Sequence, residues 1–404
     1  MKHNFEEYID RSGTESSKWD GFEERFPCLD AKGCLPMWVA DMDFKAPQQV
    51  IDAIVRKAEF GIYGYPKPKG DSFDKSVIDW INKQHGWQLK KEWIVATAGV
   101  VPGIAYTIQA LTQAGDGVII QPPVYYPFKQ TIQRNERIVV ENPLIFDEQN
   151  RTYEIDFADF ERKVKDPKNR LFILCNPHNP VGRVWSEADL RKLAELCQEN
   201  DVLIFSDEIH SDLILKGFKH IPLGSLTSEI NQNLITAYSA SKTFNLAGLQ
   251  ASVMVIANEK IRRKYIKQLE KNCVVGLNIF AAIALEAAYN HGENYLTDLL
   301  EYVESNIDYA VEFAERHLKG IKIIRPQGTY LVWMDFRGTG LSADEIDALV
   351  IEKGKIAVDL GRWFGKEGAG FLRFNFACHR STLEKALNQL KLALNEKMGT
   401  AETT

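Results

Sequence analysis

Six short, almost uninterrupted apolar runs recur along the middle of the chain, and they constrain its fold more than any other feature. Such runs form strands that are covered on both faces of a sheet. Between two of them lies a segment with apolar residues at helical spacing, which Ser186 and Asp189 open as a predicted capping box. The order strand, helix, strand predicts an α/β fold with a mainly parallel sheet between helices. The six runs are Trp93–Thr97, Gly117–Gln121, Leu171–Cys175, Val202–Ser206, Leu234–Tyr238 and Val253–Ala257.

The last third of this 404-residue chain has a different character. A long charged helical pattern, Tyr295–Leu318, leads into the sequence IKIIRPQGTYLVWMDF, and a further helix is expected at Ala343–Lys353. This predicts a separate α+β domain, in keeping with a length that exceeds one ordinary domain. We predict a large domain at residues 45–290 and a smaller α+β domain formed by residues 1–44 and 291–404.

Composition and charge exclude several function classes. A net charge of −6 argues against nucleic acid as the main partner. No uncharged apolar run is long enough to span a bilayer, so we expect no membrane association. The first residues are polar and acidic rather than an apolar leader, and the six cysteines are scattered without metal-ligand spacing. These features favour a cytoplasmic protein with free thiols and no bound metal.

Polar or glycine-bearing stretches follow four of the predicted strands. They are AGVVPG (Ala98–Gly103), NPHNPVGR (Asn176–Arg183), DEIH (Asp207–His210) and SASK, which ends at Lys242. Each has an ordinary structural explanation, because Asn and Pro form turns, a strand-end Asp often caps a helix, and a lone Lys usually lies on the surface. In an open α/β sheet, however, ligands bind beyond the carboxyl ends of the strands. The four stretches together therefore predict one shared site.

The chemistry that suits this set is that of pyridoxal 5′-phosphate (PLP), which needs an amine for its aldehyde and a carboxylate for its pyridine nitrogen. Lys242 is the only candidate amine in the converging set. Asp207 would keep the pyridine nitrogen protonated, so that the ring draws electrons from the substrate carbon. Asn176 could donate its amide to the phenolic oxygen of the ring.

The same part of the sequence offers groups for the phosphate and the ring of that cofactor. AGVVPG places Val100 and Val101 near the first turn of a predicted helix, where free backbone N–H groups and the helix dipole favour an anion. Ser239 and Ser241 add hydroxyl donors. Tyr125, in PPVYYPF, follows another strand and could cover the ring.

At these residues the sequence resembles the fold-type I PLP enzymes, the aminotransferase-like superfamily, over nearly the whole chain. Asn176, Asp207 and Lys242 follow that family's order and spacing, since 207 − 176 = 31 and 242 − 207 = 35. The resemblance implies a seven-stranded sheet, a cofactor bonded to Lys242, and a ring that stacks on Tyr125. It also implies that His210 lies near the phenolic oxygen, with a purely structural histidine as the alternative.

Substrate and partner contacts are implied by the same resemblance. Arg373, in FLRFNFA, matches the arginine that grips the substrate α-carboxylate, and pairing with a structural carboxylate is the alternative. Tyr65, in YGYPKPKG, matches a tyrosine that reaches the phosphate bound by the neighbouring subunit, and such sites lie at a homodimer interface. Asp41 and Tyr63 are further candidates for the substrate site, with a turn residue and a core aromatic as the respective alternatives.

One departure from the family pattern narrows the resemblance. Many aminotransferases carry an arginine eight residues after the lysine, as a phosphate ligand, whereas this chain has Gln250 there. The sequences SKTFNLAGLQAS and MWVADMDF resemble the cystathionine β-lyase or carbon–sulfur lyase subgroup, also called the MalY/PatB type. That subgroup implies α,β-elimination from L-cystathionine and related cysteine thioethers to thiol, pyruvate and ammonia. Lys242 would be the base, and Tyr125 is one candidate for protonating the leaving sulfur.

Three alternatives stay open at this point. The first is an aminotransferase that acts on a small amino acid with the same cofactor. The second is a protein with an additional regulatory role in binding a partner protein. The third, a nicotinamide-dependent oxidoreductase, is disfavoured because no GxGxxG sequence follows a first strand.

Overall fold

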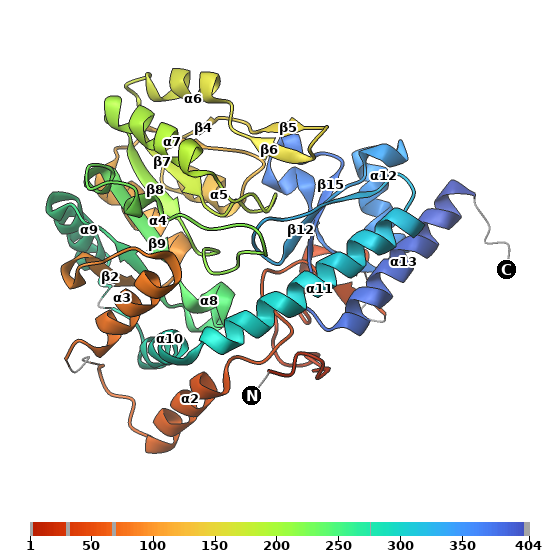
Figure 1. Ribbon diagram of the computed structural model, residues 1–404, viewed down its shortest axis with the longest axis horizontal. Helices are drawn as coiled ribbons and strands as arrows, with labels where there is room; N and C mark the ends of the chain where they lie inside the picture. The colour runs from red at the N-terminus through yellow and green to blue at the C-terminus, as the bar shows by residue number, and fades with distance from the viewer. Residues whose placement is uncertain (1–2, 30–32, 67–69, 275, 400–404) are drawn as a thin grey trace.

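The computed structural model describes residues 3–29, 33–66, 70–274 and 276–399, and its centre is a seven-stranded sheet (Figure 1). The strand order is β2-β10-β9-β8-β7-β3-β4. β10 is antiparallel to both of its neighbours, and the other pairs are parallel. The predicted α/β fold with a mainly parallel sheet is therefore confirmed. The strands are β2 (Ile94–Thr97), β3 (Gly117–Ile120), β4 (Ile138–Glu141), β7 (Asn169–Cys175), β8 (Leu203–Asp207), β9 (Leu234–Tyr238) and β10 (Ser252–Val255).

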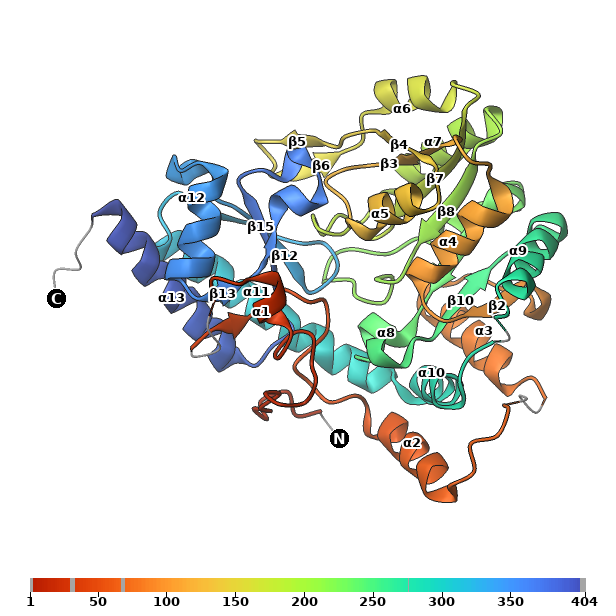
Figure 2. The same cartoon turned by 180° about the vertical axis from the view of Figure 1, so that it is seen from behind.

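Helices cover both faces of this sheet, as the two opposite views show (Figures 1 and 2). One face carries α4 (Val100–Leu111), α5 (Pro127–Arg134) and α9 (Glu259–Lys271), and the other carries α3 (Ser72–His85), α6 (Phe157–Val164), α7 (Glu187–Glu199) and α10 (Ile279–His291). Side chains of each strand alternate between the two layers, as the period of two requires. On β7, Leu171 and Ile173 pack toward α4 and α5, whereas Phe172 and Leu174 pack toward α6 and α7.

The capping box predicted at the start of α7 is present. The Ser186 hydroxyl accepts a hydrogen bond from the Asp189 N–H at 3.1 Å, and the Asp189 carboxylate accepts one from the Ser186 N–H at 3.3 Å. These two bonds satisfy donors that a helix otherwise leaves free at its first turn. The helix that connects β7 to β8 therefore starts where the sequence predicts.

The last third of the chain builds a second, antiparallel sheet with the order β11-β12-β15-β14. Residues near the start of the chain lie beside it, because β1 pairs in parallel with β13 (Figure 2). The domain boundary predicted near residue 290 stays a prediction. At this point of the chain, Gly292 separates α10 from α11. The elements are β1 (Leu35–Pro36), β11 (Lys322–Ile324), β12 (Leu331–Asp335), β13 (Ile356–Ala357), β14 (Asp359–Leu360), β15 (Phe371–Asn375), α1 (Phe22–Arg25), α11 (Glu293–His317), α12 (Ala343–Ala348) and α13 (Arg380–Met398).

Three further features complete the fold. A hairpin of β5 (Ile145–Asp147) and β6 (Thr152–Glu154) follows the edge strand β4, and α2 (Gln48–Phe60) packs on α10. A single helical turn, α8 (Ala240–Thr243), follows β9 directly. Within the described residues, no helix is both long enough and apolar enough to cross a bilayer.

Candidate active site

The carboxyl ends of β2, β7, β8 and β9 meet the start of β10 around a cavity of about 280 Å³. All four stretches that the sequence predicts to converge contribute to its wall. Since β10 runs antiparallel, its first residue reaches the same edge of the sheet. The wall is formed by Ala40, residues 98–102, Tyr125, Cys175, Asn179, Asp207, Ile209, His210, Ser239, Ser241, Lys242, Ala247 and residues 250–252.

Lys242 lies on α8, one turn beyond the end of β9. Its Nζ donates a hydrogen bond to the carbonyl oxygen of Ala40 at 2.8 Å. Desolvation and the nearby charge of Arg373 lower the pKa of Lys242 to about 8, against the opposing effects of Asp41 and Asp207. A lysine with such a pKa has a usable neutral fraction near neutral pH, which an amine needs to act as a nucleophile or base.

Asp207 is the last residue of β8 and is buried. Burial raises the pKa of its carboxyl to about 7, although a hydrogen bond from the Ile209 N–H at 3.1 Å and the charge of Lys242 act in the opposite direction. Within the described residues, Asp207 forms no salt bridge. Its carboxylate on the cavity wall could therefore pair with a cationic group of a bound ligand. Its predicted role beside a protonated ring nitrogen stays a prediction.

The asparagine on this wall is Asn179, not the predicted Asn176. Asn176 is fully buried behind the wall, where its Nδ2 donates to the carbonyl oxygen of Ile221 at 3.3 Å. Asn179, three residues later in NPHNPVGR, lines the cavity, and its Oδ1 accepts a hydrogen bond from Arg373 Nη1 at 3.0 Å. Its Nδ2 is the group of this stretch that can serve a ligand in the cavity.

Arg373 lies on β15, behind Asn179 rather than on the cavity wall itself. Besides Asn179, its guanidinium donates to the carbonyl oxygen of Trp38 at 3.0 Å and pairs with the carboxylate of Asp359, which is also fully buried. The pairing that the sequence analysis weighed as an alternative is thus present. The Nε–H is buried without a partner among the described residues, so one donor is left for a ligand.

One end of the cavity offers groups that could hold an anion. Gly99 precedes α4 with a φ of 112°, a backbone conformation that favours glycine, and Val100 and Val101 form the first turn of the helix. Backbone N–H groups of a first helical turn have no partner within the helix and carry a partial positive charge. Ser239 and Ser241, 2.9 Å apart at their hydroxyl oxygens, lie on the same wall.

No arginine lies among the wall residues of this cavity. At the position where the resemblance expects one, Gln250 adopts a left-handed conformation with a φ of 55° and lines the wall. An anion at this end would therefore be held by backbone N–H groups, hydroxyls and one amide, rather than by a guanidinium.

Tyr125 and His210 occupy the wall as the sequence predicts. Burial raises the pKa of the Tyr125 phenol well above its ordinary range, so the hydroxyl keeps its proton. Burial, Lys242 and Arg373 lower the pKa of His210 well below its ordinary value, so the imidazole is neutral. Its Nδ1 is buried without a hydrogen-bond partner among the described residues. An unpartnered buried nitrogen is costly, and a bound ligand would satisfy it.

Besides Asn176 and Arg373, three further residues predicted at the site are not among the wall residues. Asp41 is held by Arg11, whose guanidinium donates to both carboxylate oxygens at 3.0 Å, and it is not among the wall residues, so its role at the substrate site stays a prediction. Tyr63 is exposed, and its ring contacts that of Phe280 in a tilted arrangement, with the ring centroids 5.6 Å apart. Tyr65 is fully exposed at 104%. Its predicted role belongs to a second subunit, so that role stays a prediction.

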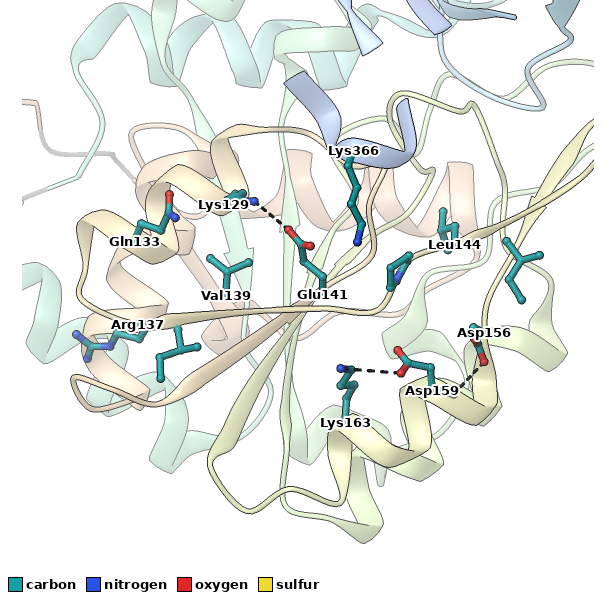
Figure 3. A pocket seen from close by; sticks show the side chains of 13 residues that line it. Lys129, Gln133, Arg137, Val139, Glu141, Leu144, Asp156, Asp159, Lys163 and Lys366 are labelled. Atoms are coloured by element: carbon teal, nitrogen blue, oxygen red, sulfur yellow. Dashed lines mark hydrogen bonds and ion pairs between the residues drawn. The ribbon is translucent and has the colours of Figure 1, made fainter. Parts of the chain in front are cut away.

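A larger hollow, of about 930 Å³, lies elsewhere, along the edge strand β4 (Figure 3). Four of its charged side chains form pairs: Lys129 contacts Glu141 at 2.9 Å, and Lys163 approaches Asp159 at 3.9 Å. No group of histidine, cysteine and acidic side chains within the described ranges is placed to hold a metal ion. The cavity at the strand ends is therefore the better candidate for chemistry.

Comparison with known proteins agrees with this geometry. A family model described as aminotransferase class I and II matches residues 33–390. The chain belongs to this family. Over 392 residues it is 44% identical to the cystathionine beta-lyase PatB of Bacillus subtilis (strain 168), covering 97% of this chain and 100% of that protein. It is 31% identical to the protein MalY of Escherichia coli (strain K12), and this match covers 95% of this chain and 97% of that protein.

Among solved structures, cystalysin from Treponema denticola, which contains pyridoxal 5′-phosphate, matches with a TM-score of 0.94 at 34% identity. The match covers 98% of this chain and 100% of that one. The resemblance inferred from the sequence, including the MalY/PatB-type subgroup, is confirmed by these relatives.

Proposed function

We propose that the protein is a PLP-dependent carbon–sulfur lyase that performs α,β-elimination on L-cystathionine and related cysteine thioethers. The observation that carries the proposal is Lys242, an amine with a pKa of about 8, on one wall of a cavity that Asp207 also lines. The 44% identity to a cystathionine beta-lyase over nearly the whole chain supports the reaction type.

The donor set fits the cofactor. Lys242 would bond to its aldehyde, Asp207 would face the pyridine nitrogen, and Tyr125 would lie against the ring. His210 Nδ1, buried and unpartnered, and the amide of Asn179 would serve the phenolic oxygen. When bound, the cofactor withdraws electrons from the substrate Cα and so makes the Cα–H bond acidic.

The phosphate would take the helix end of the cavity. Val100 and Val101 offer backbone N–H groups, Ser239 and Ser241 offer hydroxyls, and Gln250 offers its amide. Such a site would bind the phosphate through hydrogen bonds from neutral groups. It carries less positive charge than a site that contains an arginine.

The chain's own residues then divide the work of elimination. Arg373 binds the substrate carboxylate, with its guanidinium held by Asn179 and Asp359, and this fixes the direction of the Cα–H bond. Lys242, when it is not bonded to the cofactor, takes the Cα proton in its neutral form. The Cβ–S bond then breaks, its electron pair leaves with sulfur, and a proton from the site completes the thiol. Tyr125 is the protonated group on the wall that we assign to this transfer.

The remaining three-carbon fragment takes up water and yields pyruvate and ammonia. From cystathionine the balance is therefore one homocysteine, one pyruvate and one ammonia for each substrate and water consumed. The test is to incubate purified protein with L-cystathionine and quantify all three products, with a Lys242→Ala variant as the control. Equal amounts from the wild type and none from the variant support the proposal. Absence of free thiol from the wild type overturns it.

We further propose a cytoplasmic homodimer in which each site takes one residue from the partner chain. Phe60, Ile62, Tyr63 and Tyr65 are all more than half exposed and lie within one short segment, an apolar surface of the kind that oligomers cover. Mixing Tyr65→Phe chains with Lys242→Ala chains should restore part of the activity, because one site of each mixed dimer has both residues intact. Failure of mixed dimers to regain activity would contradict a shared site.

A further inference from the structure

The six residues DEIHSD, which run from Asp207 to Asp212, divide between two surroundings. Asp207, Ile209 and His210 line the cavity. Glu208 and Asp212 turn away from it and are buried on the other side of the wall. Two buried carboxylates next to a reaction site are expensive to maintain unless their oxygens are hydrogen-bonded.

The carboxylate of Glu208 is completely enclosed and receives four hydrogen bonds. One oxygen accepts from the Ser206 hydroxyl at 2.8 Å and from the Leu223 N–H at 3.1 Å. The other contacts His220 Nε2 at 2.9 Å and accepts from the Tyr238 hydroxyl at 2.6 Å. Burial alone would raise the pKa of Glu208, but His220 and the other donors hold it below its ordinary value.

The carboxylate of Asp212 has its own set of partners. It contacts His85 Nε2 at 2.9 Å, accepts from the Thr243 hydroxyl at 2.9 Å, and accepts from the indole N–H of Trp80 at 3.2 Å. The rings of His85 and His220 meet edge to face, with centroids 5.2 Å apart. The two carboxylates therefore belong to one buried network, which joins the end of α3 to the ends of β8 and β9 and to α8 (Figure 1).

Both reaction-site residues are followed directly by a residue of this network: Asp207 by Glu208, and Lys242 by Thr243. We propose that the buried network is a positioning device that sets the place of Lys242 relative to Asp207, with Thr243 and Glu208 as its two attachment points. The proposal rests on the proposed function for the roles of these two residues. It adds that side chains outside the cavity are needed to position Lys242 and Asp207 for the reaction.

The attachment matters because α8 is a single turn. The helix has only four residues after its cap at Ser239, so the intrahelical bonds alone give it little stiffness. The Thr243 hydroxyl ties the last residue of this turn to Asp212, and the chain then continues into a loop. A displacement of a reacting group by about 1 Å can cost on the order of a hundredfold in rate. Loss of this one bond should therefore slow the chemistry more than it weakens substrate binding.

The experiment compares Thr243→Val, Thr243→Ser and a matched control, Thr236→Val, in the cofactor-loaded enzyme. Thr243 and Thr236 are both completely buried, but the Thr236 hydroxyl has no hydrogen-bond partner within the described residues. Valine keeps the shape of threonine and removes only the hydroxyl. The readouts are kcat and KM for thioether cleavage, the pH midpoint of the visible absorbance of the lysine–cofactor linkage, and the thermal midpoint of unfolding.

Thr243→Val should lower kcat by roughly tenfold to a hundredfold with KM nearly unchanged, and it should shift the absorbance midpoint. Thr243→Ser should restore both, and Thr236→Val should match the wild type in both. If Thr243→Val unfolds at a lower temperature but keeps the wild-type kcat and absorbance midpoint, the network is only structural and the proposal is wrong. Because the absorbance midpoint needs no turnover, it tests positioning even if the wild type releases no thiol, in which case the proposed function alone fails.

Discussion

Replacing Asp207 by asparagine should stabilise the cofactor-free protein in a way that depends on pH. Burial raises the pKa of this carboxyl from 3.8 to about 7. Between these values the folded state holds a proton that the unfolded state has released, so stability falls as the pH rises through this window. A rise from 3.8 to about 7 corresponds to about 4 kcal/mol once the pH is above 7. Asparagine cannot ionise and avoids this cost, although the favourable interaction with Lys242 is also lost.

We therefore expect the free energy of unfolding of Asp207→Asn, relative to wild type, to grow by about 2–4 kcal/mol between about pH 4 and about pH 8. The assay is urea unfolding of both cofactor-free proteins across this range, with activity measured after the cofactor is restored. Titrating groups that do not interact with Asp207 cancel in the difference; Lys242 does not, because Asp207 raises its pKa. The variant should be more stable than the wild type at the alkaline end of the range. It should be inactive after the cofactor is restored. A difference that is flat with pH, or that favours the wild type at the alkaline end, would show that burial does not raise the pKa of Asp207 in this way.

Further predictions concern the other residues of the site. Lys242→Ala should leave the purified protein without its yellow colour and without turnover, as an absorbance spectrum and a product assay would show. Asn179→Ala should lower kcat/KM at least tenfold, because the amide holds a charged donor, whereas Asn176→Ala should act mainly on stability. Arg373→Ala should cost about 2–4 kcal/mol in kcat/KM and several kcal/mol in stability, since Asp359 is left buried and unpaired. Adding Asp359→Asn to that variant should recover stability in a denaturation curve but not the activity.

Residues that directly follow an apolar strand could be placed from the sequence. Asp207 ends β8, and Ser239 and Lys242 come within four residues of the end of β9, so the strand pattern alone puts them at one edge of the sheet. The first turn of α4 was predictable for the same reason. The structure brings these residues to one cavity wall.

The other features of the site could not be predicted. They depend on contacts between residues that are distant in the sequence, or on backbone groups that any residue type provides. NPHNP holds two asparagines, and only the path of the turn decides that Asn179 faces the cavity and Asn176 does not. Asp41 is occupied by Arg11, 30 residues earlier, and no local pattern reveals that pairing. The acceptor for Lys242 is a backbone carbonyl, that of Ala40, which any residue type could provide.

The buried network of Glu208 and Asp212 could not be predicted from the sequence either. Glu208 is adjacent to Asp207 in the sequence, but its partner His220 lies 12 residues further on, and His85 reaches Asp212 across 127 residues. Histidines and acids at such separations have no spacing that distinguishes them from surface residues. What could have suggested the network is the composition of DEIHSD itself, because three acids after a buried strand cannot all face one small cavity.

A product balance in one incubation that offers both reactions decides between the lyase and the aminotransferase. L-cystathionine, L-alanine and 2-oxoglutarate are supplied together, and homocysteine, pyruvate, ammonia and glutamate are quantified over time. We expect equal release of homocysteine and ammonia, with glutamate formed far more slowly, because a thiolate is a good leaving group once the Cα proton has been removed. Rapid formation of glutamate with no homocysteine would contradict the lyase assignment and leave an aminotransferase in its place.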